Sequence, residues 1–181
     1  MYDSAQFNGF AKNELDDLLF SDIWGLFAFN ESDLHSAAYY YVRTYFQRRG
    51  SEGMFVRCEP RLRSFKPDIV VYNNYRPEYL IELKMFSTLE MVDESKIEGD
   101  LNKLQKLIGD IESIKWGFLI IAYDHDEDFS ISDARLRRRG LEKMSASSIN
   151  MRRKEGTGRR RVGYDEWRAQ FDKLRRRHGD W

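Results

Sequence analysis

The chain has 181 residues, of which 41% are hydrophobic and 33% charged, a composition typical of one globular domain with a substantial core. A single cysteine, Cys58, excludes an internal disulfide, and no apolar run approaches the ~18 residues of a membrane-spanning helix. The first residues lack the basic and then apolar pattern of a signal peptide, and we expect a cytoplasmic protein.

The formal net charge of zero combines an acidic body with a basic C-terminal region. Residues 135–181 contain 16 Lys and Arg against 6 Asp and Glu, so the residues before them are acidic by the same amount. A basic segment of this kind is typical of a nucleic-acid contact, because it neutralises phosphates. The alternative is a solvated tail that balances the acidic body.

Helices are expected before the first strand. Residues 13–20 predict a short helix and the aromatic stretch 22–29 a further turn, both within an N-terminal segment, residues 1–29, packed on the core. A long helix is expected from Asn30, a suitable N-cap with Asp33 three residues later. Its apolar stripe recurs at spacings of three and four, through Leu34, Ala37, Ala38, Tyr41, Val42, Tyr45 and Phe46.

Four apolar segments predict strands, at residues 54–59, 68–72, 78–85 and 116–123. Before the fourth, an apolar face predicts a helix over residues 96–112. The fourth segment is wholly apolar, which favours a central position, and the crossover makes it parallel to a neighbour. We therefore expect an α/β fold, a mixed sheet in the order αβββαβ flanked by helices, with its core in residues 30–134.

The rest of the chain predicts a basic helical extension, residues 135–181. The acidic loop 124–128 is expected to be a solvated connection, with cation binding as the alternative. The expected segments after it are a helix near 133–144, a flexible arm over 145–163 and a helix over 164–178. Trp167 and Phe171 are four residues apart, which predicts that they dock the last helix on the body.

Three charged residues mark two neighbouring strands. Asp68 opens one strand after Pro67, and Glu82 and Lys84 interrupt the apolar run of the next. Glu82 and Lys84 share a face because they are two residues apart. Two carboxylates and an ammonium on adjacent strands could hold a divalent metal and position a water for phosphodiester cleavage. The alternative is an exposed edge with a Glu–Lys surface pair.

Pro67-Asp68, thirteen intervening residues and Glu82-Leu83-Lys84 resemble the signature of the PD-(D/E)XK nuclease superfamily. The expected element order over about residues 30–123 resembles the restriction-endonuclease-like core of that superfamily. The resemblance implies a Mg²⁺-dependent nuclease, with Mn²⁺ able to substitute, that hydrolyses DNA and leaves 5′-phosphate ends. It also implies that Asp68, Glu82 and the carbonyl of Leu83 hold the metal and that Lys84 is the catalytic lysine.

Other polar residues are candidates for the same site. Family members often place an acidic residue that faces the metal on the first helix, and Glu31 falls on the core-facing side, where a carboxylate needs the metal or Lys84 as partner. We therefore expect Glu31 to belong to the catalytic site as an auxiliary metal ligand or water contact. The alternative for Glu31 is stabilisation by the helix dipole. His35, one turn later, is expected to be partly buried and satisfied, with contact to the site as an alternative. Weaker candidates border the apolar face of the second helix: Asp100, Lys103 and Gln105.

The basic arm supplies the expected nucleic-acid contacts, at Arg152, Arg153, Lys154, Arg159, Arg160 and Arg161. We expect DNA as the substrate, and a homodimer or a partner protein where both strands are cut. Two alternatives remain open at this point. One is a non-catalytic nucleic-acid-binding or assembly module on the same fold, and the other is an RNA-directed nuclease.

Overall fold

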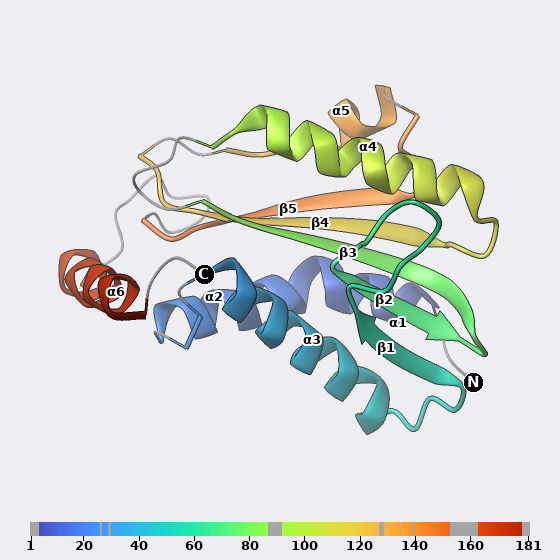
Figure 1. Cartoon of the computed structure of the whole chain (residues 1–181), viewed down its shortest axis with the longest axis horizontal. Coiled ribbons are helices and arrows are strands. Elements are labelled where there is room, and N and C mark those ends of the chain that lie inside the picture. The colour runs from blue at the N-terminus through green and yellow to red at the C-terminus, as the bar shows by residue number, and fades with distance from the viewer. Residues whose placement is uncertain are drawn as a thin grey trace.

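A five-stranded mixed sheet lies between two layers of helices in the computed structural model (Figure 1). The structure describes residues 4–25, 27–28, 30–86, 92–126, 129–138, 140–152 and 163–178. The strands are β1 (Met54–Cys58), β2 (Ile69–Asn73), β3 (Arg76–Phe86), β4 (Trp116–Tyr123) and β5 (Met144–Asn150). The helices are α1 (Ser4–Gly9), the π-helical turn η1 (Phe10–Glu14), α2 (Leu15–Trp24), α3 (Glu31–Arg48), α4 (Glu94–Asp110), α5 (Asp133–Arg138) and α6 (Tyr164–His178).

The strands follow one another across the sheet in chain order, and their directions follow from the connections between them. β1, β2 and β3 are antiparallel neighbours, and β3, β4 and β5 are parallel ones. A tight turn joins β2 to β3, whereas α4 carries the chain back before β4, as a parallel pair requires. The expected α/β class is therefore confirmed, as is the buried, parallel position of the fourth strand inside the sheet, although β3 is the middle strand.

The two faces of the sheet carry separate apolar cores. Helices α1 to α3 and α6 cover one face, and α4 and α5 cover the other (Figure 1). α3 begins where predicted, because the side chain of Asn30 accepts a hydrogen bond from the Asp33 N–H at 2.8 Å. Its apolar stripe is buried at Leu34, Ala38 and Val42. No described helix has both the length and the apolar character needed to cross a membrane.

The last helix docks as the sequence predicts. Trp167 and Phe171 are buried, and the Trp167 indole donates a hydrogen bond to the Ile23 carbonyl at 3.1 Å. The rings of Trp167 and Trp24 stack with centroids 5.2 Å apart. α6 is therefore tied to α2, at the other end of the chain.

Two predictions for the C-terminal region were wrong. Residues 144–150 form β5, which pairs with β4, whereas we expected a flexible arm from residue 145. The stretch Ser145-Ala-Ser-Ser has no apolar alternation to reveal a strand. It forms one because its backbone pairs with that of the buried strand β4. The helix expected near residues 133–144 is shorter, α5 ending at Arg138 before Gly140, whose φ of +71° suits a helix exit.

Candidate active site

Asp68, Glu82 and Lys84 converge because of the antiparallel register of β2 and β3. Ile69 faces Ile81 in this register, so Asp68, one residue before β2, lies opposite Glu82. Asp68 Oδ2 accepts a hydrogen bond from the Leu83 N–H at 2.7 Å, at a point where β2 no longer supplies a partner for β3. The carboxylate is thereby fixed against the strand that carries the other two charges.

Glu82 is the most deeply buried charged group of this cluster. Its side chain is 1% exposed, and Oε2 contacts the Lys103 ammonium while Oε1 has no hydrogen-bond partner. Burial raises the pKa of Glu82 to about 8, and the negative charge of Asp68 adds to this effect, which the Lys103 ammonium offsets only in part. A buried carboxylate with one unsatisfied oxygen is costly, and such groups are typical of functional sites.

Lys84 lies between two carboxylates. Its Nζ is 3.3 Å from Glu31 Oε1 and 3.6 Å from Asp100 Oδ2. Burial lowers the pKa of Lys84, but the negative charges of Asp100 and Glu31 outweigh burial, so the pKa is raised and the ammonium stays charged. Glu31 also accepts a hydrogen bond from the Met85 N–H at 3.3 Å. Glu31 is therefore turned toward the site, with Lys84 as its partner.

His35 contacts the site directly. Its Nε2 is 3.3 Å from Asp68 Oδ2, an ion-pair distance without the alignment of a good hydrogen bond. Burial alone would raise the pKa of Asp68, but His35 and the Leu83 N–H stabilise the carboxylate and lower it. Burial likewise lowers the pKa of His35, and Asp68 more than compensates. α3 thus holds both Asp68, through His35, and Lys84, through Glu31.

Two of the three weaker candidates on α4 belong to the cluster. Lys103 bridges Glu82 and Asp100, with its Nζ 3.2 Å from Asp100 Oδ1. Gln105 is exposed on another side of the helix. Helical spacing could have separated Gln105 from the other two. Asp100 and Lys103 are three residues apart and share one face of α4, whereas Gln105 lies outside that face.

The charges of the cluster fit a divalent cation in kind and in number. Four carboxylates, of Glu31, Asp68, Glu82 and Asp100, surround two ammonium groups. With all four ionised, as cation binding would require of Glu82, and with His35 neutral, the excess is two negative charges. Oxygen donors of this kind suit Mg²⁺ or Mn²⁺. In the arrangement seen, lysines lie between the carboxylates, and no three His, Cys, Asp or Glu side chains among the described residues are grouped closely enough to hold a metal ion. The carbonyl role expected for Leu83 stays a prediction.

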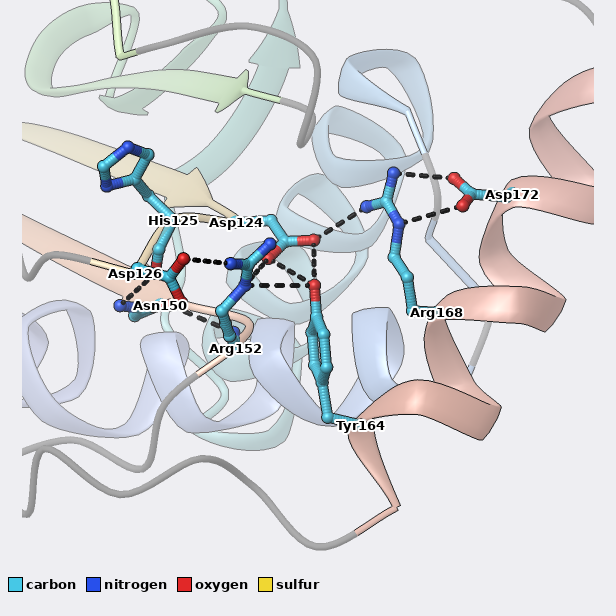
Figure 2. A network of polar contacts seen from close by, with 8 residues as sticks. All are labelled: Asp124, His125, Asp126, Asn150, Arg152, Tyr164, Arg168 and Asp172. Atoms are coloured by element: carbon cyan, nitrogen blue, oxygen red, sulfur yellow. Dashed lines mark hydrogen bonds and ion pairs between the residues drawn. The ribbon is translucent and has the colours of Figure 1, made fainter.

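A second polar cluster lies at the end of β4, where we expected a solvated acidic loop (Figure 2). The side chain of Asp124 is 0% exposed, so this prediction was wrong for Asp124. The Tyr164 hydroxyl donates to Asp124 at 2.7 Å, and the guanidinium groups of Arg168 and Arg152 lie 2.7 and 3.1 Å from its oxygens. Asp124 follows a buried strand directly, which could have indicated its burial.

The expected nucleic-acid contacts lie mostly outside the described residues. Arg153, Lys154, Arg159, Arg160 and Arg161 belong to that part of the chain. Arg152 is described, and it forms ion pairs with Asp124 and with Asp126, the latter at 2.6 Å. Arg152 therefore holds the end of β4 to the residues that follow β5, and a role in phosphate binding stays a prediction.

Comparisons with known proteins add no family. No family model matches the chain, and no curated protein or solved structure is significantly similar to it.

Proposed function

We propose that the protein is a metal-dependent nuclease of the restriction-endonuclease-like kind, which hydrolyses phosphodiester bonds in DNA. The observation that carries the proposal is the convergence of Asp68, Glu82 and Lys84 from two adjacent strands. The order of elements from α3 to β4, helix, three strands, helix and strand, supports the same assignment. One oxygen of the buried Glu82 carboxylate has no hydrogen-bond partner, which leaves it available to a bound cation.

In this proposal the carboxylates of Asp68 and Glu82 hold Mg²⁺. When bound, the ion polarises the scissile phosphate and makes a water more acidic. Lys84 orients the attacking water or offsets the negative charge that develops on the phosphate. Glu31 and His35 are positioning residues, because Glu31 holds the Lys84 ammonium and His35 holds the Asp68 carboxylate.

Lys103 has a separate role. Its ammonium contacts Glu82 and Asp100, so it neutralises the site when no cation is bound. A cation at Asp68 and Glu82 would compete with this contact, since both draw on the same carboxylate. Lys103 and Asp100 are then free to contact the substrate phosphate or the water.

The test is cleavage of supercoiled plasmid, linear duplex, single-stranded DNA and RNA in Mg²⁺, Mn²⁺ or EDTA. We expect cleavage that requires metal and that falls at least about a hundredfold in Lys84→Ala. Lys115→Ala is the matched control, because Lys115 forms an ion pair with another buried glutamate of β3, Glu78, at 2.9 Å. This control should cleave like the wild type.

The assay also separates the alternatives. Cleavage of RNA alone would support an RNA-directed nuclease. Binding without cleavage of any substrate, unchanged in EDTA, would reject the nuclease in favour of a non-catalytic nucleic-acid-binding or assembly module.

A further inference from the structure

Three aromatic rings form a surface cluster near the free edge of the sheet. Phe55 of β1 and Tyr72 of β2 face each other across the strands, with ring centroids 4.9 Å apart and planes only 2° from parallel. Tyr75, in the turn between β2 and β3, places its ring 5.5 Å from Phe55. The Arg57 guanidinium lies 5.7 Å above the Phe55 ring. We call Phe55, Tyr72 and Tyr75 the aromatic platform.

Tyr75 is an unexpected residue for its position. It is 86% exposed, and with Asn74 it forms a two-residue hairpin turn in which both residues have positive φ, +47° for Asn74 and +67° for Tyr75. Such turns prefer Asn-Gly, because a side chain is strained at positive φ. A large exposed ring therefore occupies a position where glycine would favour the fold, and strain of this kind often marks a functional surface.

The platform lies on the same face of the sheet as the candidate active site. Side chains alternate along a strand, so Val70 and Tyr72 point to one face of β2. Asp68, just before β2, continues this alternation at the end of the sheet, where its carboxylate also reaches His35 of α3. The face that carries Val70 and Tyr72 is the one covered by α4, since both pack in its core and Lys103 of α4 contacts Glu82. Asp68 is four residues from Tyr72, about 13 Å along the strand.

Basic side chains accompany the platform on its face of the sheet. The segment that joins β1 to β2 runs over this face, because Leu62 and Phe65 pack on the α4-side core. It carries Arg61 and Arg63, both exposed, in addition to Arg57 at the platform, and its one glutamate, Glu59, is paired with Lys66. A basic surface with exposed flat rings complements a chain of phosphates with accessible bases.

We propose that the aromatic platform binds unpaired nucleobases, so that a single-stranded segment of nucleic acid lies along this face toward Asp68 and Glu82. Bases stack on aromatic rings whatever their sequence, and the arginines neutralise the backbone between them. Binding of the strand does not require cleavage. The inference rests on the proposed function only in its second part, that the bound strand is then cut at Asp68 and Glu82. It gives the proposed nuclease a substrate with a single-stranded portion.

The test is a binding measurement in EDTA. The fluorescence anisotropy of a labelled oligo-dT, and of a labelled abasic oligonucleotide of equal length, reports how tightly the protein binds each strand. The wild type should bind oligo-dT more tightly, because the abasic strand has the same phosphates but no bases. Tyr75→Gly should weaken oligo-dT binding roughly 5- to 150-fold and leave abasic binding unchanged. Because this variant creates an Asn-Gly turn, its urea midpoint should be equal to or above that of the wild type.

Control variants separate stacking from general effects. Tyr40 on α3 is 61% exposed and lies in the opposite helix layer, so Tyr40→Ala should bind oligo-dT like the wild type. Phe55→Leu should weaken the binding of oligo-dT, because it removes a flat ring. Phe55→Trp keeps a flat ring at this position and should bind oligo-dT like the wild type.

Three outcomes would overturn the inference. One is equal wild-type affinity for the two strands, or no binding of either. Another is wild-type affinity of Tyr75→Gly for oligo-dT. The third is a change in sedimentation of Tyr75→Gly without a change in binding, which would make the platform a contact between copies of the chain. Base-dependent binding without cleavage would reject the proposed nuclease but would still support base stacking on the aromatic platform.

Discussion

Glu82 shows how burial and charge compete at a single residue. Its side chain is almost completely enclosed, two other carboxylates raise its pKa, and one lysine opposes them. Lys103 keeps its charge because it is shared between two carboxylates, so Glu82 is the member of the pair that is driven toward neutrality. Removing the excess negative charge with a cation would reverse this preference, since a metal ligand must be ionised.

The raised pKa of Glu82 predicts how stability depends on pH in EDTA. Between 4.5, the ordinary value, and about 8, the folded state holds a proton on Glu82 that the unfolded state has lost. This contribution to stability is fully present below about pH 4.5 and is lost progressively as the pH rises toward 8. Glu82→Gln removes the titrating group, so the wild type should lose more stability than the variant over this range.

The measurement is the urea midpoint of both proteins at several pH values from 5 to 9. Other groups titrate in both proteins alike, so the difference between the two curves isolates Glu82. Parallel curves would contradict the raised pKa.

The members of the cluster that could be predicted from the sequence are those whose position on a strand or helix could be deduced. Asp68 and Lys84 are recognisable because a charge at the start or in the middle of an apolar strand is unusual. The contact of Glu31 with Lys84 follows from helical periodicity, which turns Glu31 inward. The contact of Lys103 with both Glu82 and Asp100 could not be deduced, because it depends on the position at which α4 packs along the sheet.

At the scale of the elements, the hairpin and the crossover helix determine where the site forms. The turn between β2 and β3 sets the register that brings Asp68 opposite Glu82. The crossover through α4 places Lys103 and Asp100 above the same strand. Strands and helices with strong apolar periodicity were predicted closely, whereas β5 was missed, since its pairing depends on β4 more than on its own residues.

The network at Asp124 predicts a large and a small effect on stability. Asp124→Ala leaves the guanidinium groups of Arg152 and Arg168 without their buried partner and should lower the free energy of unfolding by about 3–5 kcal/mol. Asp126→Ala removes a partner of Arg152 that is 69% exposed, and should cost less than about 1 kcal/mol. Urea denaturation of the two variants measures both values.

An equal loss in the two variants would mean that burial of Asp124 does not matter for stability. Tyr164→Phe is a gentler change at the same place, because it removes one hydroxyl that donates to Asp124. It should cost about 1–3 kcal/mol.

At the scale of the whole molecule, the C-terminal region is part of the folded body as well as a source of basic charge. β5 completes the sheet, and α6 buries Tyr164, Trp167 and Phe171 in the same core as α1 to α3. By charge, the sequence divides into an acidic body and a basic extension. Charge alone could not show that the extension contributes a strand and a packed helix, because these depend on contacts with residues far away in the chain.

Removal of residues 145–181 should therefore unfold the protein. The deletion exposes β4 along its whole length and opens the core beneath α6. A typical domain has a free energy of unfolding of only about 5–15 kcal/mol, so it does not tolerate the loss of a whole strand and a packed helix. Urea denaturation should show no cooperative transition in the truncated chain. A transition with the wild-type midpoint would contradict the integration of β5 and α6 into the fold.

The central claim is that Asp68 and Glu82 hold a divalent cation, and metal binding tests it without any choice of substrate. Mn²⁺ titration, followed by electron paramagnetic resonance, should show binding by the wild type that is at least about tenfold weaker in Glu82→Gln. Glu78→Gln, which changes a buried, lysine-paired glutamate elsewhere on β3, should bind like the wild type. Equal Mn²⁺ affinity in all three proteins would contradict the assignment of this site.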